Sequence, residues 1–205
     1  NNPTGTIVEA KQLYDWIANA PKNHLFLVDE AYYDYAQANP SYSSALPLIK
    51  QGNHNVIITR TFSKAYGMAG MRIGYGIATK EMADKINPYA AGFNLNAAGI
   101  AAASASLDDH PFYQSSIESN LLAKKILTTT LDELNLDYIP SNTNFVLHRI
   151  GQPIDTYAQH MRQNGIRVGR KMTKDENWNR LSIGTPEEMK QFSHTLIAFR
   201  QKGWV

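Results

Sequence analysis

The stretch from Arg60 to Tyr75 reads RTFSKAYGMAGMRIGY and places one lysine, Lys64, among hydroxyl side chains and glycines. Residues 55–59, directly before it, read NVIIT, a β-branched run that is typical of a buried parallel strand. Lys64 would then follow the carboxyl end of that strand, which is the edge where open α/β sheets bind ligands. The pattern predicts that this stretch anchors a phosphate-bearing cofactor.

The side chains around Lys64 suit that role. The hydroxyl groups of Thr61 and Ser63 can donate hydrogen bonds to phosphate oxygens, and Arg72 can add a charge-assisted contact. A lysine amine becomes a nucleophile at neutral pH when it lies in a desolvated pocket or beside cations. A lysine considered alone is usually a solvated surface group, so the prediction depends on the whole set of residues.

A second candidate residue, in this case an acid, follows another apolar run. Residues 25–28 read LFLV, which fits a buried parallel strand, and Asp29 follows them. A carboxylate among apolar neighbours is costly unless it is paired, which favours a functional role over a helix cap or a plain surface acid. Glu30 would point to the opposite side of the strand, and we assign it no role.

These motifs resemble those of fold type I pyridoxal-phosphate aminotransferases of class I/II, and most closely those of the histidinol-phosphate aminotransferase branch. The Arg60–Tyr75 stretch resembles the family's Schiff-base segment, Asn1–Gly5 (NNPTG) its Asn-Pro-Thr-Gly turn, and Val28–Tyr32 (VDEAY) the strand end whose aspartate faces the pyridine nitrogen. Residues 141–145 (SNTNF) and 179–184 (NRLSIG) resemble small-domain segments that hold the substrate carboxylate. The resemblance covers the whole chain.

The resemblance implies an α/β fold with a three-layer large domain, present here in part, and a small α+β carboxyl-terminal domain. The sequence breaks at residues 108–111, so we expect residues 1–110 to belong to the large pyridoxal-phosphate-binding domain and residues 111–205 to form the small domain. A long helix starting near Pro111 would connect them. Since the chain starts inside a cofactor motif, we expect it to be the carboxyl-terminal portion of a longer protein.

The resemblance also implies a cofactor site for pyridoxal 5'-phosphate composed of Asn2, Asp29, Tyr32, Thr61, Ser63, Lys64 and Arg72. Lys64 would form the Schiff base and serve as the catalytic acid and base. Asp29 would pair with the pyridinium nitrogen, and Tyr32 and Asn2 would donate to the phenolic oxygen of the cofactor. No metal is expected, because helix capping explains the sequential trio Asp108, Asp109 and His110.

The substrate would be held from the carboxyl-terminal part of the chain. A guanidinium can hold a carboxylate bidentately, and the resemblance places Arg180 against the substrate α-carboxylate with help from Asn144. Residues 166–169 are expected to form a strand, whose alternation would let only one of Arg167 and Arg170 point inward; we favour Arg170. An inward arginine there suits an anionic side chain, although residues 171–178 depart from the histidinol-phosphate pattern.

The expected activity is transfer of an amino group between an amino acid or amino phosphate, of the histidinol-phosphate or aromatic type, and a 2-oxo acid. Two alternatives stay open: a lyase, decarboxylase or synthase of the same fold, and an aminotransferase-like effector domain of a transcription regulator. The family resemblance implies a homodimer with sites at its interface.

The composition of the chain restricts which partners it can have. The chain has 205 residues, 43% hydrophobic content and a formal net charge of +2 with dispersed basic residues, so nucleic acid is not indicated as a partner. Without cysteine there is no disulfide framework and no cysteine-ligated metal. No apolar stretch approaches the roughly 20 residues that span a bilayer. We therefore expect small-molecule partners, no membrane association and a cytoplasmic location.

Overall fold

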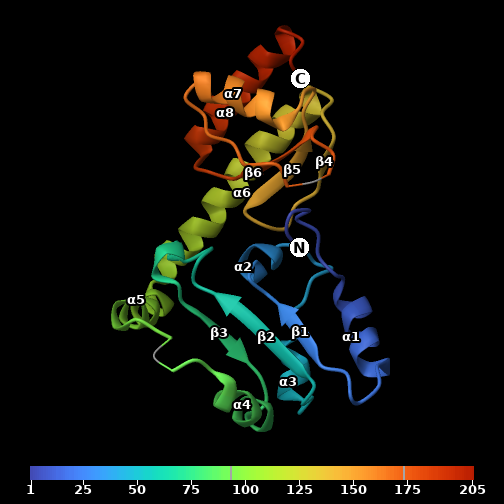
Figure 1. Ribbon diagram of the computed structural model, residues 1–205, viewed down its shortest axis with the longest axis vertical. Helices are drawn as coiled ribbons and strands as arrows, with labels where there is room; N and C mark the ends of the chain where they lie inside the picture. The colour runs from blue at the N-terminus through green and yellow to red at the C-terminus, as the bar shows by residue number, and fades with distance from the viewer. Residues whose placement is uncertain (93, 173) are drawn as a thin grey trace. The chain divides into compact units, whose positions relative to one another are not determined.

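The computed structural model in Figure 1 shows two compact units. One comprises Ile7–Gln114, and we call it the lysine unit; the other combines Asn1–Thr6 with Ser115–Val205, and we call it the carboxyl-terminal unit. The structure describes residues 1–92, 94–172 and 174–205.

The lysine unit contains a three-stranded sheet with flanking helices (Figure 1). Its elements in chain order are α1 (Ala10–Asn19), β1 (Phe26–Asp29), α2 (Tyr33–Ala36), α3 (Leu46–Lys50), β2 (Val56–Thr61), η1 (Ala69–Met71), β3 (Gly74–Ile77), α4 (Lys80–Ile86), η2 (Asn87–Tyr89), α5 (Ala97–Asp108) and the start of α6 (His110–Glu133). Helices α1 and α3 pack on the sheet face that carries Val56 and Ile58, both of which are fully buried.

The sheet brings two strand ends to one edge. Strand β1 pairs with β2 in parallel, with Asp29 beside Thr59, and β2 pairs with β3 antiparallel, with Thr61 beside Gly74. The parallel strand predicted directly before the lysine stretch is therefore confirmed. Because β1 and β2 run in the same direction, Asp29 and the chain that leads to Lys64 leave the sheet at the same edge.

Strand β1 corrects one prediction about burial. It is parallel as expected, but Leu27 is 67% exposed and Leu25 is 58% exposed, while Phe26 is buried. Within the described part of the chain, β1 is therefore covered on one face, and its continuous apolar sequence does not correspond to burial on both.

Helix α6 contains the point where the two units divide. It confirms the predicted long connecting helix, and Asp109 accepts a hydrogen bond from the Phe112 N–H at 3.1 Å, as the capping interpretation of this segment requires. The assignment of residues 1–110 and 111–205 to separate domains stays a prediction. Among the helices described, α6 included, none has the length and apolar composition needed to cross a membrane.

The carboxyl-terminal unit is an antiparallel sheet packed against helices. Its elements are the rest of α6, β4 (Tyr138–Ile139), β5 (Phe145–Arg149), α7 (Ile154–Gln163), β6 (Trp178–Ser182) and α8 (Pro186–Gln201). Side chains from α6, α7, α8 and the central strand β5 form one continuous core, in which Leu127, Tyr157 and Leu196 are fully buried. Helix α8 begins with a capping box between Thr185 and Glu188, which the sequence signal predicted.

The strand predicted over residues 166–169 was wrong, since these residues are irregular. Gly165 adopts φ +76°, and the Ile166 N–H donates to the carbonyl oxygen of Met161 at 3.0 Å. These residues complete the carboxyl end of α7, so their backbone groups serve a helix terminus instead of a sheet ladder.

Candidate cofactor and substrate site

Lys64 lies just beyond the carboxyl end of β2 and faces an aromatic ring. Its Nζ is 5.2 Å from the ring centroid of Tyr32, and both residues are partly buried. Tyr32 immediately precedes α2, on the chain that leaves β1. The structure therefore brings together two residues that the sequence predicted for one site, although they lie 32 positions apart along the chain.

Thr61 orders the turn that presents Lys64. Its Oγ1 accepts a hydrogen bond from the Ser63 N–H at 3.1 Å and lies 3.4 Å from the carbonyl oxygen of Ile73. A hydroxyl that binds its own backbone two residues on is a recurrent turn device. The role predicted for Thr61 and Ser63 in phosphate binding stays a prediction.

Apolar rings pack beside the lysine turn. Phe62 is 5% exposed, and its ring lies 5.0 Å from that of Tyr66 and 5.6 Å from that of Tyr75. Tyr66 in turn packs 5.1 Å from Tyr113. Phe62 and Tyr66 thus belong to a cluster of aromatic rings whose members lie on both sides of Lys64 along the chain.

Asp29 is the last residue of β1 and is exposed. Its Oδ1 accepts a hydrogen bond from the Ala31 N–H at 2.9 Å, which orients the carboxylate at the edge shared with β2. The structure therefore places Asp29 at the expected edge, and its pairing with a pyridinium nitrogen stays a prediction.

Arg72 occupies an unusual backbone position. It adopts φ +56° and ψ +45°, a left-handed conformation that residues other than glycine rarely take, and its Nη1 donates to the Ala69 carbonyl at 2.8 Å. Asn96 Nδ2 holds the same turn through the Met71 carbonyl at 2.9 Å. Backbone conformations of this kind recur at ligand sites, where the surrounding structure compensates their cost. The exposed guanidinium contacts its own turn here.

Sequence reasoning gave no role to Glu30, which the structure shows to be 4% exposed and hydrogen-bonded to Arg60. The alternation of strand residues predicted that it would face away from Asp29, but no local pattern identifies a partner 30 residues away. Nearby, burial raises the pKa of Asp34, and the hydrogen bond that the Tyr113 hydroxyl donates to it at 2.9 Å offsets this only in part.

The carboxyl-terminal unit joins Asn2 to Arg180. Arg180 Nε donates to Asn2 Oδ1 at 2.9 Å, and the guanidinium carbon lies 3.7 Å from the ring centroid of Phe145. Because Asn2 and the ring fix the guanidinium plane, a carboxylate would be held through the two Nη groups. The structure thus brings together a residue predicted to contact the cofactor and one predicted to bind the substrate.

Two motifs of the resemblance also meet within this unit. The Asn142 N–H donates to the Gly5 carbonyl at 2.8 Å, and a Cβ at Gly5 would lie 2.6 Å from the hydroxyl of Ser141. Lys124 Nζ donates to the Ser141 carbonyl at 3.0 Å, and burial lowers the pKa of Lys124 to about 8. Sequence reasoning missed Lys124, because nothing in the α6 pattern distinguishes it from Lys125.

The other predicted substrate residues lie beside β6. Asn144 precedes β5, and its carbonyl accepts from the Ile183 N–H at 2.9 Å. A Cβ at Gly169 would fall 2.6 Å from the Arg180 carbonyl oxygen, so the segment that carries Arg170 runs against β6. Arg170 itself is exposed, and its inward orientation stays a prediction.

The residues of the lysine unit fit a phosphate-bearing cofactor that reacts with an amine. A partly buried lysine stands over an aromatic ring, hydroxyl groups adjoin it, and two parallel strands end at the same edge. Gly67 then turns the chain with φ +68°, a conformation that favours glycine.

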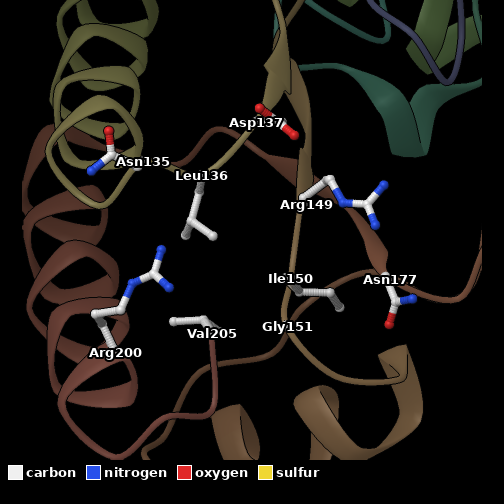
Figure 2. A pocket seen from close by; sticks show the side chains of 9 residues that line it. All are labelled: Asn135, Leu136, Asp137, Arg149, Ile150, Gly151, Asn177, Arg200 and Val205. Atoms are coloured by element: carbon white, nitrogen blue, oxygen red, sulfur yellow. The ribbon is translucent and has the colours of Figure 1, made fainter.

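A cavity elsewhere in the carboxyl-terminal unit contains none of these residues. Its volume is about 310 Å³, and it is lined by the residues drawn in Figure 2: Asn135, Leu136, Asp137, Arg149, Ile150, Gly151, Asn177, Arg200 and Val205. Figure 2 shows the guanidinium groups of Arg149 and Arg200 apart from one another. Arg149 pairs with Asp175 at 3.5 Å and Arg200 donates to the Leu134 carbonyl, so the two cations do not converge on a ligand.

Comparison with solved structures defines the fold. A crystal structure from Erwinia carotovora atroseptica matches all of this chain and 59% of its own, with a TM-score of 0.94 and 42% identity. The histidinol-phosphate aminotransferase of Sinorhizobium meliloti, solved in complex with pyridoxal-5'-phosphate, matches 95% of this chain and 54% of its own, with a TM-score of 0.81 and 29% identity. The chain therefore has the α/β fold of the pyridoxal-phosphate transferases, as predicted.

Comparison of sequences defines the family. The family model for aminotransferase class I and II matches residues 1–196, and the chain belongs to this family. The histidinol-phosphate aminotransferase of Halalkalibacterium halodurans is 38% identical over 190 residues, which are 92% of this chain and 51% of that protein. The chain spans about half the length of the curated relatives it matches. Family membership and the complex from Sinorhizobium meliloti support pyridoxal phosphate as the cofactor.

Proposed function

We propose that this chain is part of a pyridoxal-phosphate-dependent aminotransferase that transfers an amino group between an amino acid or amino phosphate and a 2-oxo acid. The observation that carries the proposal is the position of Lys64, which faces the Tyr32 ring at the edge where parallel β1 and β2 both end. Membership of the aminotransferase family supports the same reading.

The cofactor would be held by Asn2, Asp29, Tyr32, Thr61, Ser63, Lys64 and Arg72. When bound, pyridoxal phosphate supplies an electron sink that makes the α-hydrogen of an attached amino acid acidic. Asp29, at the sheet edge, would pair with a protonated ring nitrogen. Thr61, Ser63 and Arg72 supply the phosphate with two hydroxyl donors and a guanidinium.

Lys64 supplies the proton transfers. Its Nζ would take the proton from the substrate α-carbon and hold it for return, which is positioned general acid and base catalysis. The Tyr32 ring lies 5.2 Å from this amine, so the amine and the ring face one another in the proposed site. The turn closed by Thr61 keeps the amine at this position between the two transfers.

Arg180 would bind the substrate carboxylate. Arg180 Nε donates a hydrogen bond to Asn2, and the guanidinium of Arg180 stacks on the Phe145 ring. The guanidinium is therefore oriented before the substrate binds, and it loses little conformational freedom on binding. Asn144 would assist from the start of β5. Arg170 would recognise an anionic side chain such as a phosphate, in keeping with histidinol phosphate or a related donor.

A homodimer and a cytoplasmic location complete the proposal. Both are inferred from the family to which the chain belongs, and small-molecule substrates are its only proposed partners.

The test uses the full-length protein with pyridoxal phosphate. A panel of amino acids, together with the amino phosphate histidinol phosphate, is added while the cofactor spectrum is recorded, first without and then with 2-oxoglutarate. We expect one class of donors to convert the cofactor to its pyridoxamine form and the oxo acid to reverse the change. Release of carbon dioxide would instead indicate a decarboxylase, and a spectrum that responds to amino acids without ever converting would indicate an effector domain.

A further inference from the structure

A buried ion pair joins Glu30 to Arg60, which are the chain neighbours of the proposed cofactor residues Asp29 and Thr61. Glu30 is 4% exposed, and its Oε2 accepts hydrogen bonds from Arg60 Nε at 3.0 Å, Arg60 Nη2 at 2.8 Å and the Ser44 hydroxyl at 2.9 Å. Its Oε1 accepts from the Ala45 N–H at 2.8 Å. Both carboxylate oxygens are therefore paired inside the lysine unit.

Arg60 is held from three sides. Its side chain is 14% exposed, its Nη2 also reaches the Ser44 hydroxyl at 3.1 Å, and its guanidinium carbon lies 3.7 Å from the ring centroid of Tyr33. A lysine ammonium could keep the charge but could not make the two contacts to Glu30 and stack on the ring together. The geometry is therefore specific for arginine.

The pair connects the segments that carry the proposed cofactor residues. Glu30 directly follows Asp29, and its N–H donates to the Thr59 carbonyl at 2.9 Å, next to Arg60. Arg60 lies near the end of β2, four positions before Lys64. Tyr33, on which Arg60 stacks, follows the Tyr32 that faces Lys64.

Stability alone is a weak reason for such a pair, because desolvation of two charges offsets much of their attraction and apolar residues often serve a core as well. Specific geometry is a stronger reason at a site whose reacting groups must be held closely. We propose that Glu30 and Arg60 are positioning residues for the cofactor site, which fix the β1 end with Asp29 against the β2 end with Lys64. This inference rests on the proposed function.

The test compares Arg60→Lys and Glu30→Gln with the wild type, all as full-length protein. A control variant, Lys80→Ala, removes a surface ion pair to Asp84 in the same unit, where the side chains are 90% and 59% exposed. The measurements are the melting temperature of the apoprotein, the dissociation constant of pyridoxal phosphate, and kcat and KM for the amino donor that the panel identifies.

We expect both variants to bind the cofactor less tightly and to lose about 10- to 100-fold in kcat, the effect of displacing reacting groups by a fraction of an ångström to an ångström. KM for the donor should change little, because the proposed carboxylate ligand Arg180 belongs to the other unit. The control should match the wild type in every measurement.

Variants with a lower melting temperature but wild-type cofactor affinity and kcat would overturn the inference, since the pair would then serve stability alone. If neither variant folds, Ser44→Ala removes one hydrogen bond from Glu30 and decides the matter: unchanged affinity and kcat overturn the inference, and reduced values support it. A wild-type protein that neither binds pyridoxal phosphate nor transaminates would overturn the proposed function, and the positioning inference with it.

Discussion

The two units bury their apolar side chains in different ways. In the carboxyl-terminal unit one continuous core joins three helices to the sheet. In the lysine unit the buried apolar residues form two smaller clusters, one under α1 and α3 and one beside the lysine turn. Among the residues that the structure describes, the exposed large apolar side chains outside 7–114 are Leu121 and Leu122.

Helix α5 shows the difference most clearly. It reads AAGIAAASASLD, is apolar on all sides, and leaves Ile100 46% exposed and Leu107 51% exposed. Helices of this composition are normally buried. The lysine unit therefore combines exposed apolar surface with a buried polar network next to the proposed cofactor residues. In the carboxyl-terminal unit, the proposed substrate residues belong to a unit with one continuous apolar core. Substitutions at the proposed site in the lysine unit should therefore lower activity more than stability. Substitutions in the core of the carboxyl-terminal unit should lower stability.

The largest effect is expected at Lys64. Lys64→Ala removes the amine that would bond to the cofactor and move its protons, so kcat should fall by at least about 10⁴-fold. Stability should change little, because Lys64 is partly exposed. The measurement is steady-state activity of the full-length protein together with borohydride reduction followed by peptide mass analysis.

Lys50→Ala, at an exposed position on α3, is the matched control and should keep both activity and the cofactor–peptide bond. A borohydride-stable cofactor adduct on another lysine in Lys64→Ala would show that the proposed site is wrong.

The next effect concerns the core of the carboxyl-terminal unit. Phe192 is 1% exposed, and Phe192→Ala should lower the free energy of unfolding by about 3–5 kcal/mol, since it removes buried area and leaves a cavity. Trp16 in the lysine unit is 64% exposed and packs edge-on against Phe26 at 5.2 Å, so Trp16→Ala should cost about 1 kcal/mol or less. Urea unfolding of both variants measures the contrast. Equal losses would mean that the exposed face around Trp16 is covered in the full-length protein.

Arg180→Lys should separate binding from cofactor chemistry. A lysine cannot reproduce the guanidinium that contacts Asn2 and Phe145, so KM for amino donors should rise about 10- to 100-fold, the effect of losing one or two hydrogen bonds to a charged group. Cofactor affinity should stay at the wild-type value. Arg162→Lys, exposed on α7, is the control. An unchanged KM across the whole donor panel would contradict the role of Arg180.

Sequence reasoning reached the features that depend on local pattern. The β-branched run ahead of Lys64 became β2, and the Thr185 and Glu188 signal became a capping box, because each is set by neighbours along the chain. The family motifs added the site residues that local pattern leaves ambiguous, such as Asn2, whose proximity to Arg180 spans 178 positions.

Features that depend on tertiary partners escaped prediction. The sequence did not predict a role for Glu30, because its partner Arg60 becomes adjacent to it only when β1 and β2 pair. The strand expected over residues 166–169 failed, since Gly165 and Ile166 use their backbone groups to end α7. The left-handed backbone conformation of Arg72 could not be predicted from the sequence, because glycine is the residue that normally indicates a positive φ.

The last prediction is a pH dependence of stability in the core of the carboxyl-terminal unit. His148 is fully buried, with Nδ1 2.9 Å from the Arg149 carbonyl oxygen and Nε2 3.0 Å from Asn179 Nδ2. The carbonyl can only accept, so Nδ1 carries the proton and Nε2 accepts from the amide of Asn179. Burial lowers the pKa of His148 from 6.5 to about 4.

The sign of this dependence follows from proton binding. Between pH 6.5 and about 4 the unfolded chain binds a proton at His148 that the folded chain does not, so the free energy of unfolding falls as the pH is lowered through this window. The contribution reaches at most about 1.4 kcal/mol per pH unit. His148→Gln should be less stable than the wild type at pH 7 and should show a shallower loss toward pH 4 in urea titrations, whereas the exposed control His24→Gln should retain the full slope. A His148→Gln slope equal to that of the wild type would assign the acid sensitivity to other groups, and the core of the carboxyl-terminal unit would then owe none of its pH response to this histidine.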